Sequence, residues 1–135
     1  MPSAAIDTSL VLRLLTNSPE DQARLALDEL TARLTSGAGV FVSDLVVSEA
    51  YYALQHHYRM PKAEALGLLS EFLRDSGVTS TGGAKAVLAL PRLATAKPGF
   101  VDRLIHADAV RCAEEFLTFE TAARRLKNAR VLRVS

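Results

Sequence analysis

Short apolar segments alternate with longer amphipathic ones along the whole chain, and this alternation limits the fold more than any other feature of the sequence. The short segments are predicted strands, at residues 3–6, 40–42, 78–79, 116–118 and 130–134. Short strands separated by helices are typical of βαβ units, whose parallel strands form a sheet covered by helices on both faces. We therefore expect an α/β protein with a short-stranded parallel central sheet.

The longer segments carry the signals of helices. They are predicted at residues 10–15, 19–34, 45–57, 61–73, 84–93, 100–113 and 121–126. Ser18 is expected to be the N-cap of the second of these, with Pro19 at its first helical position and Asp21 placed for a capping box. Ser43 is expected to cap the third, and Gly77 to end the fourth.

Length and composition predict one globular domain over residues 1–135, because 49% of the residues are hydrophobic and 23% are charged. The one cysteine, Cys112, excludes an internal disulfide and is expected to be a buried thiol among small apolar neighbours. No signal peptide or membrane span is evident, so a cytoplasmic protein is expected. The net charge of +1 neither suggests nor excludes a nucleic-acid partner.

Two acids follow predicted strands. Asp7 comes directly after the first strand, and Glu120 comes after the strand at residues 116–118. In parallel sheets, ligands bind beyond the carboxyl ends of the strands, so both acids are expected at the same edge. Each has a simpler alternative as the cap of the helix that follows it.

Glu49 lies in the middle of a predicted helix, on the same face as the apolar residues Leu45, Val46, Tyr52 and Ala53. An acid on a buried apolar face has to be paired, protonated or bound to a cation, because burying a bare carboxylate is costly. A salt bridge to an arginine is the alternative.

Asp102 lies in the first turn of the helix that follows Pro98 and Gly99. There it either serves a site or simply interacts with the helix dipole. Asp108, further along this helix, is expected to be a solvated surface acid, and His106 is expected to be structural.

Converging acids would have one predictable consequence. Two carboxylates about 4 Å apart repel each other by about 4 kcal/mol at an effective dielectric constant near 20. Three or four would protonate, distort the site or bind a cation. Oxygen ligands without Cys or His suit Mg²⁺ or Mn²⁺, which lower the pKa of a bound water and stabilise charge on a phosphodiester.

Four segments occur in the order found in PIN domains. They are IDTSLVLRLL at residues 6–15, VVSEAYYAL at 46–54, GFVDRLIHADAVRCA at 99–113 and FLTFET at 116–121. Because these segments run through nearly the whole chain, the sequence resembles the PIN-domain family. In length it is most similar to the VapC-type toxins of bacterial and archaeal toxin–antitoxin pairs. The resemblance implies a PIN-like α/β/α sandwich and a metal-dependent endoribonuclease.

The resemblance also implies roles for individual residues. Asp7, Glu49 and Asp102 match the acids that hold Mg²⁺ or Mn²⁺, and Glu120 stands where the family usually has Asp, one methylene shorter. Thr8 and Ser9 match positions that orient the first acid or a metal-bound water, and Thr118 is expected to do the same for the fourth acid.

RNA binding requires cations around an acidic cleft. Arg13, within two turns of Asp7, is the best individual candidate. Other candidates are Arg103, Arg111, Arg124, Arg125, Lys127, Arg130 and Arg133.

The resemblance implies further partners: a cognate antitoxin, and a homodimer formed through the apolar helices at residues 25–34 and 61–73. Packing of these helices within one core is the competing interpretation. Two other functions stay open at this point, an RNA-processing PIN nuclease and a catalytically silent PIN-like module that binds RNA or protein. Glu120 is the feature that favours the silent module.

Overall fold

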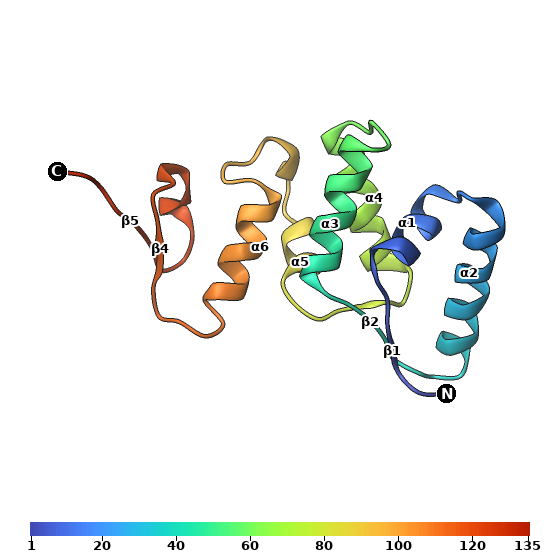
Figure 1. Cartoon of the computed structure of the whole chain (residues 1–135). Coiled ribbons are helices and arrows are strands. Elements are labelled where there is room, and N and C mark those ends of the chain that lie inside the picture. The colour runs from blue at the N-terminus through green and yellow to red at the C-terminus, as the bar shows by residue number, and fades with distance from the viewer.

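A computed structural model describes all residues from 1 to 135, and it has a three-stranded parallel sheet at its centre (Figure 1). The strands are β1 (Ala4–Ala5), β2 (Val40–Val42) and β3 (Thr79–Ser80), in the order β1-β2-β3. The parallel register pairs Ala4 with Val40 and Phe41 with Thr79. The predicted α/β class and the parallel sheet of short strands are therefore confirmed.

Six α-helices connect and surround these strands. They are α1 (Thr8–Thr16), α2 (Glu20–Thr35), α3 (Asp44–His56), α4 (Lys62–Asp75), α5 (Ala84–Leu88) and α6 (Phe100–Ala109). There are also two short 3₁₀ helices. The first, η1 (Leu93–Thr95), follows α5, and the second, η2 (Thr121–Arg125), follows β4. No helix is both long and apolar enough to cross a membrane.

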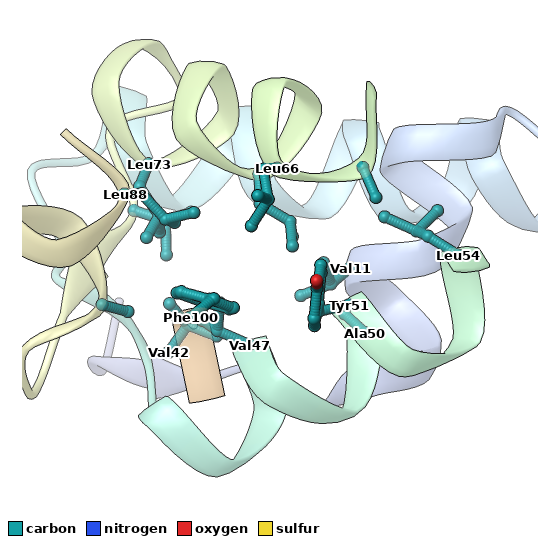
Figure 2. Packing of buried hydrophobic residues seen from close by; sticks show 14 of the residues in the cluster. Val11, Val42, Val47, Ala50, Tyr51, Leu54, Leu66, Leu73, Leu88 and Phe100 are labelled. Atoms are coloured by element: carbon teal, nitrogen blue, oxygen red, sulfur yellow. The ribbon is translucent and has the colours of Figure 1, made fainter. Parts of the chain in front are cut away.

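One hydrophobic cluster of 22 buried residues joins β2, the six helices and Ile6, the residue that follows β1. Figure 2 shows Val42 of the sheet, Val47 and Tyr51 of α3, and Leu66 of α4 within this cluster. Phe100 of α6 meets the Tyr51 ring edge-on, with ring centroids 5.1 Å apart. This contact fixes the first turn of α6 against α3.

The C-terminal residues form a second, separate sheet. Strands β4 (Phe116–Thr118) and β5 (Ala129–Val131) pair in parallel, with η2 between them. The hydrophobic cluster contains no residue after Leu104, and Ala123 is the one buried residue beyond α6. In Figure 1, β4 and β5 lie beside α6 at the end of the molecule opposite β1.

His106 joins α6 to this second sheet. Its Nε2 lies 2.7 Å from the Lys127 carbonyl oxygen, and its ring meets the ring of Phe116 edge-on at 5.3 Å. The imidazole is buried, and its Nε2 is paired with a backbone carbonyl. The structural role predicted for His106 is therefore confirmed.

Boundaries predicted for α2, α5 and α6 are wrong. Helix α2 begins at Glu20 with Pro19 as its N-cap, and no side chain caps it. The Asp21 carboxylate accepts a hydrogen bond from the neighbouring Gln22 N–H, so the expected Ser18 cap and capping box do not form. Helix α5 ends at Leu88 rather than near residue 93, because Pro91 interrupts it and Arg92 adopts a positive φ of 55°.

Cys112 is exposed, so the predicted buried thiol is wrong. Helix α6 ends at Ala109 instead of residue 113, and the turn that follows lies outside the hydrophobic cluster. Asp108 is exposed, as predicted, with its carboxylate 3.7 Å from the Arg111 guanidinium.

Candidate active site

Asp7 stands where β1 ends and α1 begins. Its carboxylate accepts hydrogen bonds from the Leu10 N–H at 3.1 Å and the Ser9 hydroxyl at 2.7 Å. These bonds, that of Ser9 first, lower the pKa of Asp7, because each favours the ionised form. Asp7 is therefore the N-cap of α1 and also an exposed, ionised carboxylate at the end of a parallel strand.

Thr8 brings Glu49 to the same place. The Thr8 hydroxyl donates a hydrogen bond to the Glu49 carboxylate, which joins the first turn of α1 to the middle of α3. Because Thr8 directly follows Asp7, this bond holds the second predicted acid beside the first. The two acids come from positions more than 40 residues apart, and packing between α1 and α3 makes their approach possible.

Glu49 is exposed, which corrects the prediction of a buried acid. Helix α3 buries a different face, formed by Val47, Ala50, Tyr51 and Leu54. Its other apolar stripe faces outward: Leu45 is 82% exposed and Tyr52 is 58% exposed. No salt bridge neutralises Glu49, so its partner is the Thr8 hydroxyl.

Asp102 lies in the first turn of α6 and is exposed. No hydrogen bond or ion pair involves its carboxylate. Its neighbour Val101 lines a shallow groove together with Glu49, Val46 and Tyr52. The structure thus brings Val101, the residue before Asp102, to the groove that contains Glu49, and the contact between Phe100 and Tyr51 keeps this helix end in position.

Glu120 follows β4 in the second sheet and is exposed. Its backbone N–H donates to the Thr118 hydroxyl at 3.0 Å, so Thr118 fixes the turn that carries the acid. This sheet lies at the far end of the molecule from β1 (Figure 1). Glu120 is therefore not brought to Asp7 and Glu49 within one chain.

The acids of one chain do not converge on a single point in this arrangement. Carboxylate oxygens are the right donors for Mg²⁺ or Mn²⁺. However, no group of three or more His, Cys, Asp or Glu side chains lies close enough together to hold a metal ion. The structure joins the Asp7 turn to Glu49 and leaves Asp102 and Glu120 outside that pair.

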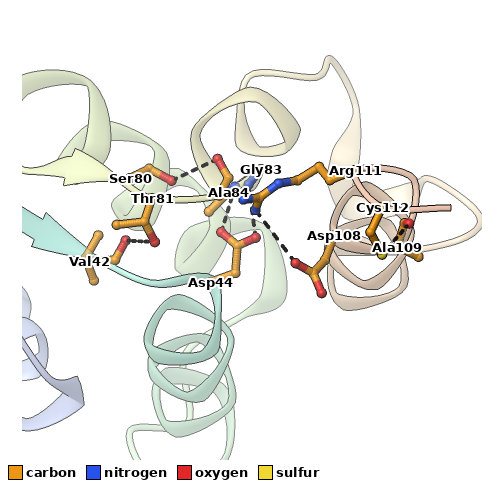
Figure 3. A network of polar contacts seen from close by, with 11 residues as sticks. Val42, Asp44, Ser80, Thr81, Gly83, Ala84, Asp108, Ala109, Arg111 and Cys112 are labelled. Atoms are coloured by element: carbon orange, nitrogen blue, oxygen red, sulfur yellow. Dashed lines mark hydrogen bonds and ion pairs between the residues drawn. The ribbon is translucent and has the colours of Figure 1, made fainter.

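Asp44 has a positioning role that the sequence did not reveal. Its carboxylate accepts hydrogen bonds from the backbone N–H groups of Gly83 and Ala84, both at 3.0 Å, and so ties the start of α3 to the start of α5 (Figure 3). A Cβ on Gly82 would lie 2.3 Å from an Asp44 oxygen, which explains a glycine there. Ser43 caps α3 through Val46 N–H, as predicted.

A groove of about 320 Å³ runs beside Asp44, between α3 and α6. Its apolar wall includes Leu45, Val101 and Ile105, all exposed. Only the fold shows which backbone groups Asp44 binds.

The predicted cations lie in different surroundings. Arg13 donates to the Gln22 side chain at 2.7 Å and lines a shallow groove with Ser9. Arg103 donates to the Pro98 carbonyl at 2.7 Å and so supports the turn before α6. The remaining candidates gather near the C-terminus. Residues 116–135 carry five lysines and arginines and one acid, so this segment is strongly basic.

The fold and the acids that follow its strands define a class of α/β protein with a candidate ligand site beyond the end of a parallel strand. The model of the PIN domain matches residues 4–129, and the chain therefore belongs to the PIN-domain family. PIN domains are generally metal-dependent nucleases. No curated protein is similar enough to the chain to be matched.

Proposed function

We propose that the protein is a metal-dependent endoribonuclease that hydrolyses RNA phosphodiester bonds. The observation that carries this proposal is the hydrogen bond from Thr8 to Glu49, made beside Asp7 at the carboxyl end of β1 in a chain of the PIN-domain family. Ligand sites of parallel sheets form at this edge. Acids held there without a cationic partner are suited to binding a cation.

The ion we propose is Mg²⁺ or Mn²⁺, with Asp7, Glu49 and Asp102 as its protein ligands and Glu120 as the fourth acid of the site. Hard cations prefer oxygen ligands, and such ions activate water and stabilise charge on a phosphodiester. In this proposal Ser9 orients Asp7 and Thr8 orients Glu49, in line with the hydrogen bonds that each makes. Thr118 orients the turn of Glu120.

RNA contacts are proposed for two basic regions. Arg13 lies on α1, within two helical turns of Asp7, and lines a groove together with Ser9. The C-terminal residues Arg124, Arg125, Lys127, Arg130 and Arg133 give residues 116–135 a net positive charge. Phosphate contacts of this kind contribute binding that weakens as the salt concentration rises.

The biological role we propose is that of a VapC-type toxin neutralised by an antitoxin. Exposed apolar side chains support a protein partner: on α2, Leu25 is 71% exposed and Leu27 is 55% exposed. Scattered exposed leucines are common, but two on one solvent-facing helix, Glu20–Thr35, are suited to a homodimer or antitoxin contact.

A silent module that binds RNA or protein is a second candidate. It is favoured by one observation, the absence of any group of three metal-ligating side chains within the chain as arranged. The glutamate at position 120, where the family usually has Asp, also favours the silent module. An RNA-processing PIN nuclease would have the same chemistry as the toxin but no antitoxin partner.

The test is an RNA cleavage assay with Mg²⁺, with Mn²⁺ and with a chelator. We expect cleavage with either metal ion, none with the chelator, and loss of cleavage in Asp7→Asn. The matched control is Asp108→Asn, because Asp108 is an exposed acid paired with Arg111 and should not affect cleavage. Cleavage that persists in Asp7→Asn, or RNA binding without any cleavage, would contradict the proposal.

A further inference from the structure

The second sheet lacks what a stable parallel sheet needs. Parallel sheets are normally covered on both faces, and an isolated two-stranded sheet is marginally stable at best. Strands β4 and β5 contribute nothing to the hydrophobic cluster. Leu117 is 56% exposed and Phe119 is 72% exposed. This sheet therefore leaves both a strand edge and apolar side chains to be covered.

Strand β1 offers a matching free edge. The N–H groups of Ala4 and Ile6 donate to Gly39 and Phe41 of the β2 side, both at 2.9 Å. Because backbone groups alternate along a strand, the N–H and C=O of Ala5 point to the other edge, where no strand pairs. Ala5 is exposed. An unpaired edge of this kind is a template for another strand.

These two edges do not meet within one chain. His106 anchors the second sheet to α6 through the Lys127 carbonyl and the Phe116 ring. In Figure 1, α6, α5 and α3 lie between this sheet and β1. The β4 strand of a second copy can meet β1 without breaking the anchor.

We propose that two copies of the chain exchange strands, with β4 of one copy adding in parallel to β1 of the other. This inference rests on the proposed function, since it completes the same site. Aligning Glu120 with Asp7 sets the register and places Leu117 opposite Ala4. Glu120 of each copy then joins Asp7 and Glu49 of the other. The pairing is two-fold symmetric, as in most homodimers.

The choice of β1 over β3 follows from what lies at the end of each strand. β1 is followed by Ile6 and the exposed Asp7, whereas β3 is followed by Thr81, whose N–H donates to the Val42 carbonyl at 3.0 Å. The acid at that end, Asp44, already has its carboxylate bound to the N–H groups of Gly83 and Ala84. Pairing with β1 therefore both covers the edge and supplies the acid that the Asp7 site lacks.

Charge supports this contact between copies. Residues 116–135 hold five basic residues and one acid, whereas residues 1–115 hold eleven basic residues and fourteen acids. The second sheet of one copy is therefore attracted to the acidic remainder of another, which favours their encounter. This contact is different from a dimer formed through the helices α2 and α4.

Cross-linking tests the contact without relying on cleavage. The variant Ala4→Cys/Leu117→Cys/Cys112→Ser has two cysteines at facing positions of the exchanged strands, and neighbouring strands lie within disulfide reach. Oxidation should yield covalent dimers. Each single-cysteine variant, Ala4→Cys/Cys112→Ser or Leu117→Cys/Cys112→Ser, is the control and should stay monomeric on a denaturing gel. A bridge within one chain, or no bridge, would overturn the proposal.

Sedimentation of the unmodified chain and two point variants gives the second measurement. Leu117→Asp should raise the Kd of the dimer about tenfold or more, because it puts a charge on the face of the joined sheet, beside Ala4 of the other copy. Leu90→Asp, after α5 and also an exposed leucine, should leave it unchanged. The opposite pattern, or a monomeric wild type, would overturn the exchange. Because neither readout needs cleavage, an exchanged dimer that cuts no RNA would contradict the proposed function alone.

Discussion

The Thr8 hydroxyl donates a hydrogen bond to the Glu49 carboxylate, and this bond joins the turn after β1 to the middle of α3. The residue before Thr8 is Asp7, so the bond ties Glu49 to the turn that carries Asp7. We expect this bond to decide where the Glu49 carboxylate lies.

Replacing Thr8 with valine tests that role. Thr8→Val keeps the shape of the side chain but removes the donor, and a lost hydrogen bond of this kind costs about 1 kcal/mol of folding free energy. Cleavage should fall more than this loss of stability explains, because Glu49 is left without an orienting partner. Thr8→Ser keeps the hydroxyl and should keep most of the activity. Equal kcat values in Thr8→Val and Thr8→Ser would argue against an orienting role.

Asp7 should show separable structural and functional roles. Asn is as good an N-cap as Asp, whereas loss of a cap to Ala costs about 1 kcal/mol. Thermal or urea unfolding should therefore show Asp7→Ala destabilised and Asp7→Asn close to wild type. Cleavage should be lost in both. If Asp7→Asn unfolded as readily as Asp7→Ala, the capping account would be wrong.

The lowered pKa of Asp7 gives a pH dependence. The hydrogen bond from Ser9, followed by that from Leu10, stabilises the ionised carboxylate in the folded state. The resulting stability is present above the usual pKa of 3.8 and is lost as the pH falls through the lowered value. The effect is small because the carboxylate is exposed.

The free energy of unfolding, measured from pH 6 down to pH 2, should reveal this dependence as a difference between wild type and Asp7→Asn. Wild type should lose stability relative to Asp7→Asn on the acid side, and Ser9→Ala should weaken the loss. A difference between wild type and Asp7→Asn that stays constant over the whole range would contradict the assignment.

Asp44 should matter for stability rather than for chemistry. Its carboxylate satisfies the N–H groups of Gly83 and Ala84. Asp44→Ala leaves those partly buried donors unpaired, at a cost of about 1–3 kcal/mol. Gly82→Ala should also destabilise the fold, because the added Cβ would overlap the Asp44 carboxylate. Urea unfolding of both variants checks this, with the exposed Asp75→Ala as control.

Local signals in the sequence predicted much of the fold. Three of these predictions are confirmed: the strand at Val40–Val42, the Ser43 cap and the end of α4 at Gly77. Glu49 was placed on an apolar face that proved to be exposed, because periodicity shows that a stripe exists but not which stripe is buried. Leu45 and Tyr52 are apolar and still face solvent.

The candidate site was harder to predict than the fold. The positions of Asp7 and Glu120 at strand ends could be inferred, but which strands pair is a long-range property that no local pattern encodes. The separation of β4 from β1 is therefore a finding of the structure. The hydrogen bond from Thr8 to Glu49, likewise, depends on how α1 packs on α3.

Mixing two inactive variants tests the central claim most directly. Asp7→Asn and Glu120→Gln should each fail to cleave RNA alone. In an exchanged dimer of one copy of each, one site regains an intact Asp7 and Glu120, so random mixing should restore about a quarter of the wild-type sites. Recovery of cleavage on mixing, with Mn²⁺ or Mg²⁺ present, is the result we predict. A mixture as inactive as its components, under conditions where wild type cleaves, would contradict it.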